Sequence, residues 1–122
     1  MGKLIWTDEY VRRREESWYI MLDFLLESNI KQSTIDELQK ECSDNIQYSL
    51  NCNEYEIKKI ITFLNKIGVN CIDNILIDYH EFFLSSYKDF VNRFKNYKLE
   101  PLVKMINADY NNVFKQLIEL ES

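Results

Sequence analysis

Residues 70–97, NCIDNILIDYHEFFLSSYKDFVNRFKNY, hold the densest run of apolar side chains in this chain of 122 residues. These side chains recur every three or four positions, which is the spacing of one face of an α-helix. They are Ile72, Ile75, Leu76, Tyr79, Phe83, Tyr87, Phe90, Val91 and Phe94, and Phe82 and Leu84 widen the stripe. The stretch therefore predicts one long helix, over about residues 71–96, at the centre of a helical bundle. A strand over residues 71–77 is the main alternative.

The composition of the chain favours helices throughout. Two glycines and one proline are too few for the many tight turns of an all-β protein. The length suits a single domain, and the proportions of hydrophobic and charged residues, 46% and 29%, are those of a globular protein. We therefore expect an all-α protein with one domain over residues 1–122. It would be a compact bundle of five helices, or six if one of them splits.

Two amphipathic helices are expected before the third. The first spans about residues 8–27, behind a short extended arm at residues 1–6, and Asn29 can end it in a left-handed cap. The second follows Ser33 or Thr34 and continues to Leu50, and the polar residues Ser43, Asp44 and Asn45 can kink or split it.

The third and the last helices have clear end signals. Gly68 can end the third helix because glycine readily adopts the left-handed conformation of a helix C-terminus. Pro101 suits the first turn of the last helix, where its missing N–H costs nothing. Residues 107–109 can break that last helix. Its expected inner face consists of Val103, Ile106, Tyr110, Val113, Leu117 and Leu120.

Three pairs of polar residues, spaced three apart, are expected to cap helix N-termini. In such a pair the first side chain bonds to the backbone of the first turn, and the second reaches back to the cap residue. The pairs are Thr34 with Glu37, Asn53 with Glu56, and Asn70 with Asp73. They would start the second, the third and the central helix.

Charge and cysteine usage limit the compartment and the partners. The formal net charge of −5 favours a partner with a basic surface and disfavours nucleic acid. The three cysteines, Cys42, Cys52 and Cys71, are odd in number and form no CxxC pair, which is typical of free thiols in a reducing cytoplasm. The start of the chain does not resemble a signal peptide, and no apolar run is long enough to cross a membrane. We expect a cytoplasmic protein that does not bind membranes.

No catalytic or metal-binding motif emerges from the sequence. His80 is the only histidine, and the segment HEFFL has Leu84 where a zinc-binding HExxH motif needs a second histidine. The spacing of the three cysteines and His80 matches no zinc knuckle. Cys42 or Cys52 could still reach His80 through the fold. We expect no enzyme activity, no metal and no cofactor.

Protein binding is the remaining hypothesis. Abundant Ile, Asn and Lys are typical of AT-rich genomes, and the small size and acidic charge are similar to those of bacterial immunity proteins, although no motif carries this likeness. Such a protein would cover the basic active-site cleft of a nuclease-type toxin. The candidate contact residues are Asp36, Glu37, Glu41 and Asp44 for charge, and Tyr48 and Tyr55 as aromatic anchors. The simpler interpretation is a solvated acidic face for the carboxylates, and partial burial with the hydroxyl in water for the tyrosines.

Three alternatives remain open. A phage-encoded inhibitor of a host defence system would have the same features. A nucleic-acid-binding regulator could use Arg12–Arg14 or the basic stretch over residues 88–98. A homodimer could form through Ile20 and Phe24.

Overall fold

The computed structural model describes residues 22–121, which form helices joined by short turns and contain no strand. The helical elements in chain order are η2 (Asp23–Ser28), α2 (Gln32–Glu41), α3 (Asp44–Cys52), α4 (Glu54–Ile67), α5 (Ile72–Asp78), η3 (His80–Leu84), α6 (Tyr87–Asn92) and α7 (Leu99–Glu121). The predicted all-α fold is confirmed, and the alternative strand over residues 71–77 is wrong. Most of the predicted first helix, the N-terminal arm, Arg12–Arg14 and Ile20 lie outside the described residues.

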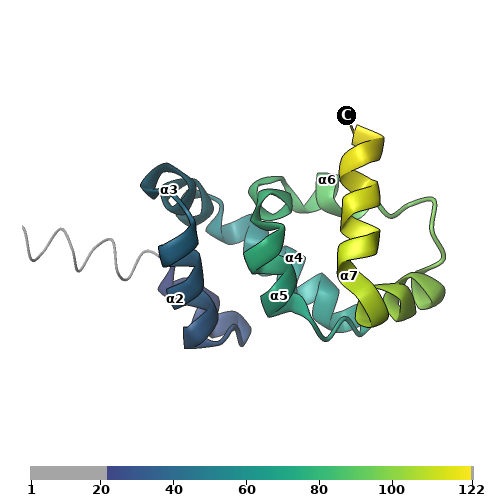
Figure 1. The fold of residues 1–122 in the computed structure, drawn as a ribbon, viewed down its shortest axis with the longest axis horizontal. Helices are drawn as coiled ribbons and strands as arrows, with labels where there is room; N and C mark the ends of the chain where they lie inside the picture. The colour runs from purple at the N-terminus through teal and green to yellow at the C-terminus, as the bar shows by residue number, and fades with distance from the viewer. Residues whose placement is uncertain (1–21, 122) are drawn as a thin grey trace, which may run out of the picture.

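Helix α4 is the element around which the others pack. It contacts η2, α3, α5, η3, α6 and α7, and its residues Ile57, Ile60, Ile61 and Leu64 are buried. These four residues form one face at the three- and four-residue spacing of a helix. Helices α2 and α3 lie at one end of the described molecule, and α6 and α7 lie at the other (Figure 1).

The predicted long central helix over about residues 71–96 is wrong, because this stretch forms α5, η3 and α6 instead. Helix α5 ends where Tyr79 leaves the helical conformation, at φ −133° and ψ 43°. Ser85 is extended, and the Ser86 hydroxyl caps α6 by accepting a hydrogen bond from the Asp89 amide at 3.1 Å. These breaks leave the apolar pattern largely intact. All of its predicted members except Tyr87, Val91 and Leu84 are buried.

The three predicted capping boxes are also wrong, because no N-cap side chain forms a capping hydrogen bond at the N-terminus of α2, α4 or α5. The side-chain amide of Asn53 donates instead to the Phe83 and Ser85 carbonyls at 2.7 and 2.9 Å. The Glu56 carboxylate accepts a hydrogen bond from the backbone amide of Tyr87 at 2.9 Å. This pair at the start of α4 therefore holds the junction between η3 and α6.

Asp73 of α5 bonds to the start of α2 in a similar way. Its Oδ2 atom accepts from the Lys31 amide at 2.9 Å and from the buried Thr34 hydroxyl at 2.7 Å. The N-terminal end of α2 is thus stabilised by a carboxylate from a distant helix. Asn70 uses its backbone amide, which donates to Asn107 Oδ1 at 2.9 Å.

Several predicted breaks are confirmed. Asn29 has a φ of 66° and ends η2, and Gly68 has a φ of 98° and ends α4 with a 3.0 Å bond from the Val69 amide to the Leu64 carbonyl. The predicted second helix splits before Ser43, whose hydroxyl caps α3. Helix α7 kinks at Asp109, where φ is −160° and ψ is 83°. The angle between its two parts is visible in Figure 1.

Phe114 is a core residue that the sequence analysis missed. Its fully buried ring stacks on Tyr79 at 5.4 Å between centroids and meets Phe82 and Phe94 edge-on at 5.2 and 6.4 Å. Leu120 was also expected on the inner face of the last helix, but it is 75% exposed. Val113 and Leu117, which follow the same kink, are buried, so the inner face of α7 ends about one turn before Leu120.

No helix among the described residues is both long and apolar enough to cross a membrane.

Candidate functional site

The predicted contact carboxylates occupy two consecutive helices, and we call Asp36, Glu37, Glu41 and Asp44 the acidic surface. Asp36, Glu41 and Asp44 are exposed, and Glu37 is half-buried. Asp36 accepts a hydrogen bond from Gln32 at 3.0 Å. Within the described part of the chain, none of the four forms an ion pair. Their negative charge is therefore available to a partner.

Glu37 differs from the other three because one of its oxygens is covered. Its Oε2 atom is buried and has no hydrogen-bond partner among residues 22–121. A covered carboxylate oxygen without a partner costs free energy, so this side chain is less suited to a surface contact than its neighbours. The acidic surface consequently relies on Asp36, Glu41 and Asp44.

The structure separates the two predicted anchors, Tyr48 and Tyr55. Tyr48 is 56% exposed and lies one helical turn after Asp44, so it adjoins the acidic surface. The Cys52 thiol, as a hydrogen-bond partner, raises the pKa of the Tyr48 hydroxyl. Tyr55 is 71% exposed, but the Lys59 ammonium lies 4.1 Å from the centre of its ring. Tyr55 therefore has a cationic neighbour.

A second surface lies between α4, α6 and the start of α7, and the sequence analysis did not find it. Two open hollows, of about 520 and 710 Å³, lie side by side and share three lining residues, Phe63, Tyr87 and Leu99. The Phe63 and Tyr87 rings pack edge-on with 6.1 Å between their centroids. We call this feature the lysine groove because it is also lined by Lys58, Lys59, Lys66, Lys88 and Lys95.

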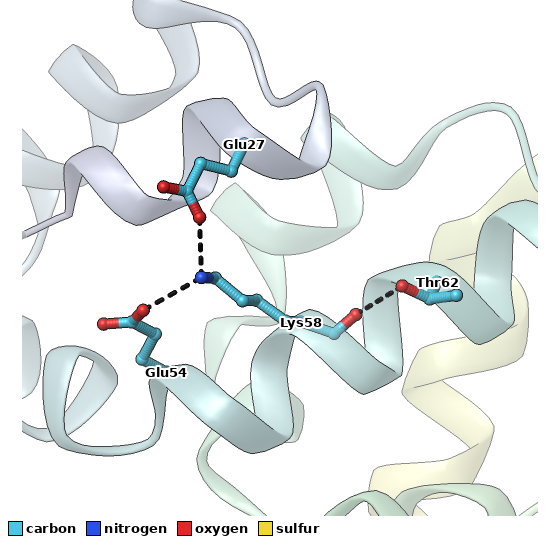
Figure 2. Close-up of polar contacts among 4 residues, drawn as sticks. All are labelled: Glu27, Glu54, Lys58 and Thr62. Atoms are coloured by element: carbon cyan, nitrogen blue, oxygen red, sulfur yellow. Dashed lines mark hydrogen bonds and ion pairs between the residues drawn. The ribbon is translucent and has the colours of Figure 1, made fainter.

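Lys58 is the groove lysine whose charge is most fully compensated. Its ammonium lies 2.6 Å from Glu27 of η2 and 3.0 Å from Glu54, one turn earlier on α4 (Figure 2). These two carboxylates raise the pKa of Lys58, with the hydrogen bond to Glu27 as the larger cause. The Lys58 carbonyl accepts a bond from the Thr62 hydroxyl at 2.8 Å. Lys58 thus ties η2 to α4.

The other groove lysines are progressively less compensated. Lys59 lies 3.8 Å from Glu56 and also covers the Tyr55 ring. Lys66, Lys88 and Lys95 are exposed, and no carboxylate of the described chain pairs with them. The rim of the groove therefore carries three uncompensated positive charges on an acidic protein.

Cys42 does reach His80, which the sequence analysis left open. The Cys42 sulfur lies 3.8 Å from His80 Nδ1, and the same nitrogen lies 3.4 Å from the Ile77 carbonyl. Burial raises the pKa of the Cys42 thiol, and the charges of Glu41 and Glu81 raise it further. A nucleophilic cysteine needs a lowered pKa and access to solvent, so this pair lacks both features of an activated thiolate.

Among residues 22–121, no three histidine, cysteine or carboxylate side chains are grouped closely enough to hold a metal ion. No protein-family model matches the chain, and comparisons with curated proteins and with solved structures find no significant match. The fold and its two surfaces thus define an all-helical protein with a separate acidic and a separate basic surface. Function is inferred from these surfaces.

Proposed function

We propose that this protein is a protein-binding inhibitor of the immunity-protein type, which covers the basic active-site cleft of a nuclease-type toxin. The observation that supports the proposal is the acidic surface, with exposed carboxylates on two consecutive helices that form no ion pair with any residue in the described part of the chain. Complementary charge would speed the encounter with a basic cleft and align the two proteins.

Four other glutamates of the described chain show why the lack of ion pairs on the acidic surface matters. Glu27, Glu54, Glu56 and Glu100 each lie within 4.0 Å of a lysine ammonium. Binding a cationic partner at those positions would first require an existing ion pair to open. Among the described residues the acidic surface has no such pair to open, so its Coulomb attraction can contribute directly to association.

Tyr48 supplies the apolar contact that charge alone lacks. Its exposed ring adjoins Asp44, and tyrosine buries a large, rigid area at low entropic cost when a partner covers it. We propose that Tyr48 slows dissociation while the carboxylates speed association. Tyr55 is assigned no role on this surface because it lies beside Lys59.

A phage-encoded inhibitor of a host defence nuclease would use the same surface in the same way. The identity of the bound protein distinguishes the two, since one is a toxin and the other a host enzyme. The three free cysteines suit a complex formed in the reducing cytoplasm.

The test is capture from lysate of the source cells, with elution by a salt gradient. The wild type is compared with a double variant, Asp36→Lys with Glu41→Lys. The control is Glu100→Lys with Glu119→Lys, which makes the same change in net charge on exposed positions of α7. We expect wild type and control to retain one basic protein, whose activity they inhibit, and the acidic-surface variant to lose it.

Equal retention by all three proteins would contradict the proposal, because the captured protein would then not recognise the acidic surface. Recovery of nucleic acid in place of a protein would also contradict it. Circular dichroism on each variant checks that the helices are intact.

A further inference from the structure

We propose that the lysine groove is a second binding site, which takes an acidic amphipathic helix from a partner protein. Such a helix would place apolar side chains on the groove floor and carboxylates against the lysines of the rim. This proposal is independent of the inhibitor function because the two surfaces have opposite charge and use different residues.

The walls of the groove have the geometry of a helix-binding site. Helix α4 contributes Lys59, Phe63 and Lys66, which are spaced by four and three residues and so share one face. That face differs from the core face of α4 and places the Phe63 ring between two lysines. Helix α6 packs beside α4 and contributes Tyr87 and Lys88. Two packed helices with an apolar seam between them form the kind of groove that receives the apolar face of a third.

The floor of the groove leaves apolar surface in contact with water. Tyr97 and Leu99 are exposed, and Phe63, Tyr87 and Val91 are only half-buried. A continuous exposed apolar patch with a polar rim is typical of an interaction surface. Because both hollows are open and share Phe63, Tyr87 and Leu99, they suit an elongated ligand better than an enclosed small molecule.

The rim determines the charge of the ligand. Lys66, Lys88 and Lys95 are exposed and have no carboxylate partner in the described chain. A carboxylate that approaches the groove would form charge-assisted hydrogen bonds without breaking an existing pair. A basic ligand would meet three uncompensated cations of like charge.

An acidic helix fits these charges better than nucleic acid does. Affinity for nucleic acid depends on the number of phosphates that lysine and arginine neutralise. Within residues 22–121, three of the five groove lysines have no carboxylate partner, because Lys58 lies between Glu27 and Glu54 and Lys59 lies near Glu56. The net charge of −5 would repel a polyanion further. An amphipathic helix needs few charges because its apolar face contributes most of the affinity.

The test uses the full chain as bait for a displayed library of random peptides of about 16 residues, roughly four helical turns. The groove variant, Lys66→Glu with Lys88→Glu, is kept out of the selection. We expect the recovered sequences to include a family of acidic peptides with apolar residues at helical spacing. A synthetic copy of the most enriched peptide of this family then gives dissociation constants by fluorescence anisotropy.

The groove variant needs a matched control, and both proteins must keep their fold. Lys104→Glu with Lys115→Glu makes the same change in net charge on exposed positions of α7, away from the groove lining. We expect the peptide to bind the groove variant at least about tenfold more weakly, and the control variant with less than about a twofold change.

Three outcomes would overturn the proposal. One is a library that yields no acidic amphipathic sequences. The second is a peptide whose affinity is the same for the groove and control variants. The third is preferential binding of another ligand, either an oligothymidylate probe or a second copy of the chain detected by sedimentation, that is lost in the groove variant.

Discussion

At the scale of single residues, two tyrosine hydroxyls connect the end of α5 to α7. Tyr110 donates a hydrogen bond to Asp78 at 2.5 Å, and Tyr79 donates one to Asn111 Oδ1 at 2.9 Å. Asp78 and Tyr79 end α5, and the other two residues follow the kink of α7. The two bonds therefore hold the second part of α7 against α5.

Because of the Tyr110 hydrogen bond, the free energy of unfolding should depend on pH in the alkaline range. The hydrogen bond to Asp78, followed by burial, raises the pKa of Tyr110 to about 12. An unfolded tyrosine ionises near pH 10, so the folded state keeps its proton between about pH 10 and 12. The stabilisation is complete below about pH 10 and is lost as pH rises towards 12.

We expect Tyr110→Phe to lower the free energy of unfolding by about 1 kcal/mol at about pH 8, the net value of one hydrogen bond. The difference between variant and wild type should shrink at about pH 11, because Tyr110 ionises there in the unfolded wild type but must keep its proton in the folded state, which favours unfolding. Urea unfolding followed by circular dichroism gives both values. A difference that stays constant or grows with pH would contradict the assignment of this hydrogen bond.

At the scale of elements, helix ends are determined by contacts between distant segments. Asn53 and Glu56 have the spacing of a capping box, yet both side chains bond to the segment over residues 83–87. Asp73 likewise bonds to the start of α2. A capping box and a tertiary bridge use the same donors and acceptors, so the spacing of the residues cannot distinguish them.

Substitutions of Asn53 distinguish the two roles. Aspartate is a good N-cap residue but cannot donate to the Phe83 and Ser85 carbonyls, and its charge would face their oxygens. We therefore expect Asn53→Asp to be more destabilising than Asn53→Ala, which should cost about 1 to 3 kcal/mol for the lost bonds. The free energy of unfolding from urea titration measures both. If Asn53 acted as a cap, aspartate would be tolerated and alanine would be the worse substitution.

At the scale of the whole molecule, α4 and an aromatic cluster connect the elements. Phe114 reaches Tyr79 at the end of α5, Phe82 of η3 and Phe94 beyond α6. The three short segments that replace the predicted long helix are thus held together by one ring from α7. Because each of them is too short to be stable alone, this shared packing stabilises them.

We expect Phe114→Ala to lower the free energy of unfolding by about 3 to 5 kcal/mol, the usual cost of emptying a buried phenylalanine site. The matched control is Leu120→Ala on the same helix, whose side chain is exposed and should change stability by less than about 0.5 kcal/mol. Thermal or urea unfolding provides the comparison. Similar small effects for both variants would show that α7 does not stabilise α5 and η3.

The acidic surface and the lysine groove lie on different elements of the molecule. The acidic surface belongs to α2 and α3, whereas the three unpaired lysines of the lysine groove belong to α4, α6 and the turn after α6. Sequence analysis identified the carboxylates because they lie close together in the chain. The lysine groove was missed because Phe63, Tyr87 and Leu99 come from three separate segments.

The amino-acid pattern was sufficient for the all-α class, for the breaks at Asn29, Gly68, Ser43 and Asp109, and for most of the core. These features depend on local properties, namely the spacing of apolar side chains and the backbone preferences of individual residues. Tertiary packing alone decided that residues 71–96 form three segments, that Phe114 enters the core, and which carboxylates and lysines are paired. A polar side chain can satisfy its hydrogen bonds within its own helix or across the fold, and only the arrangement of distant neighbours selects between them.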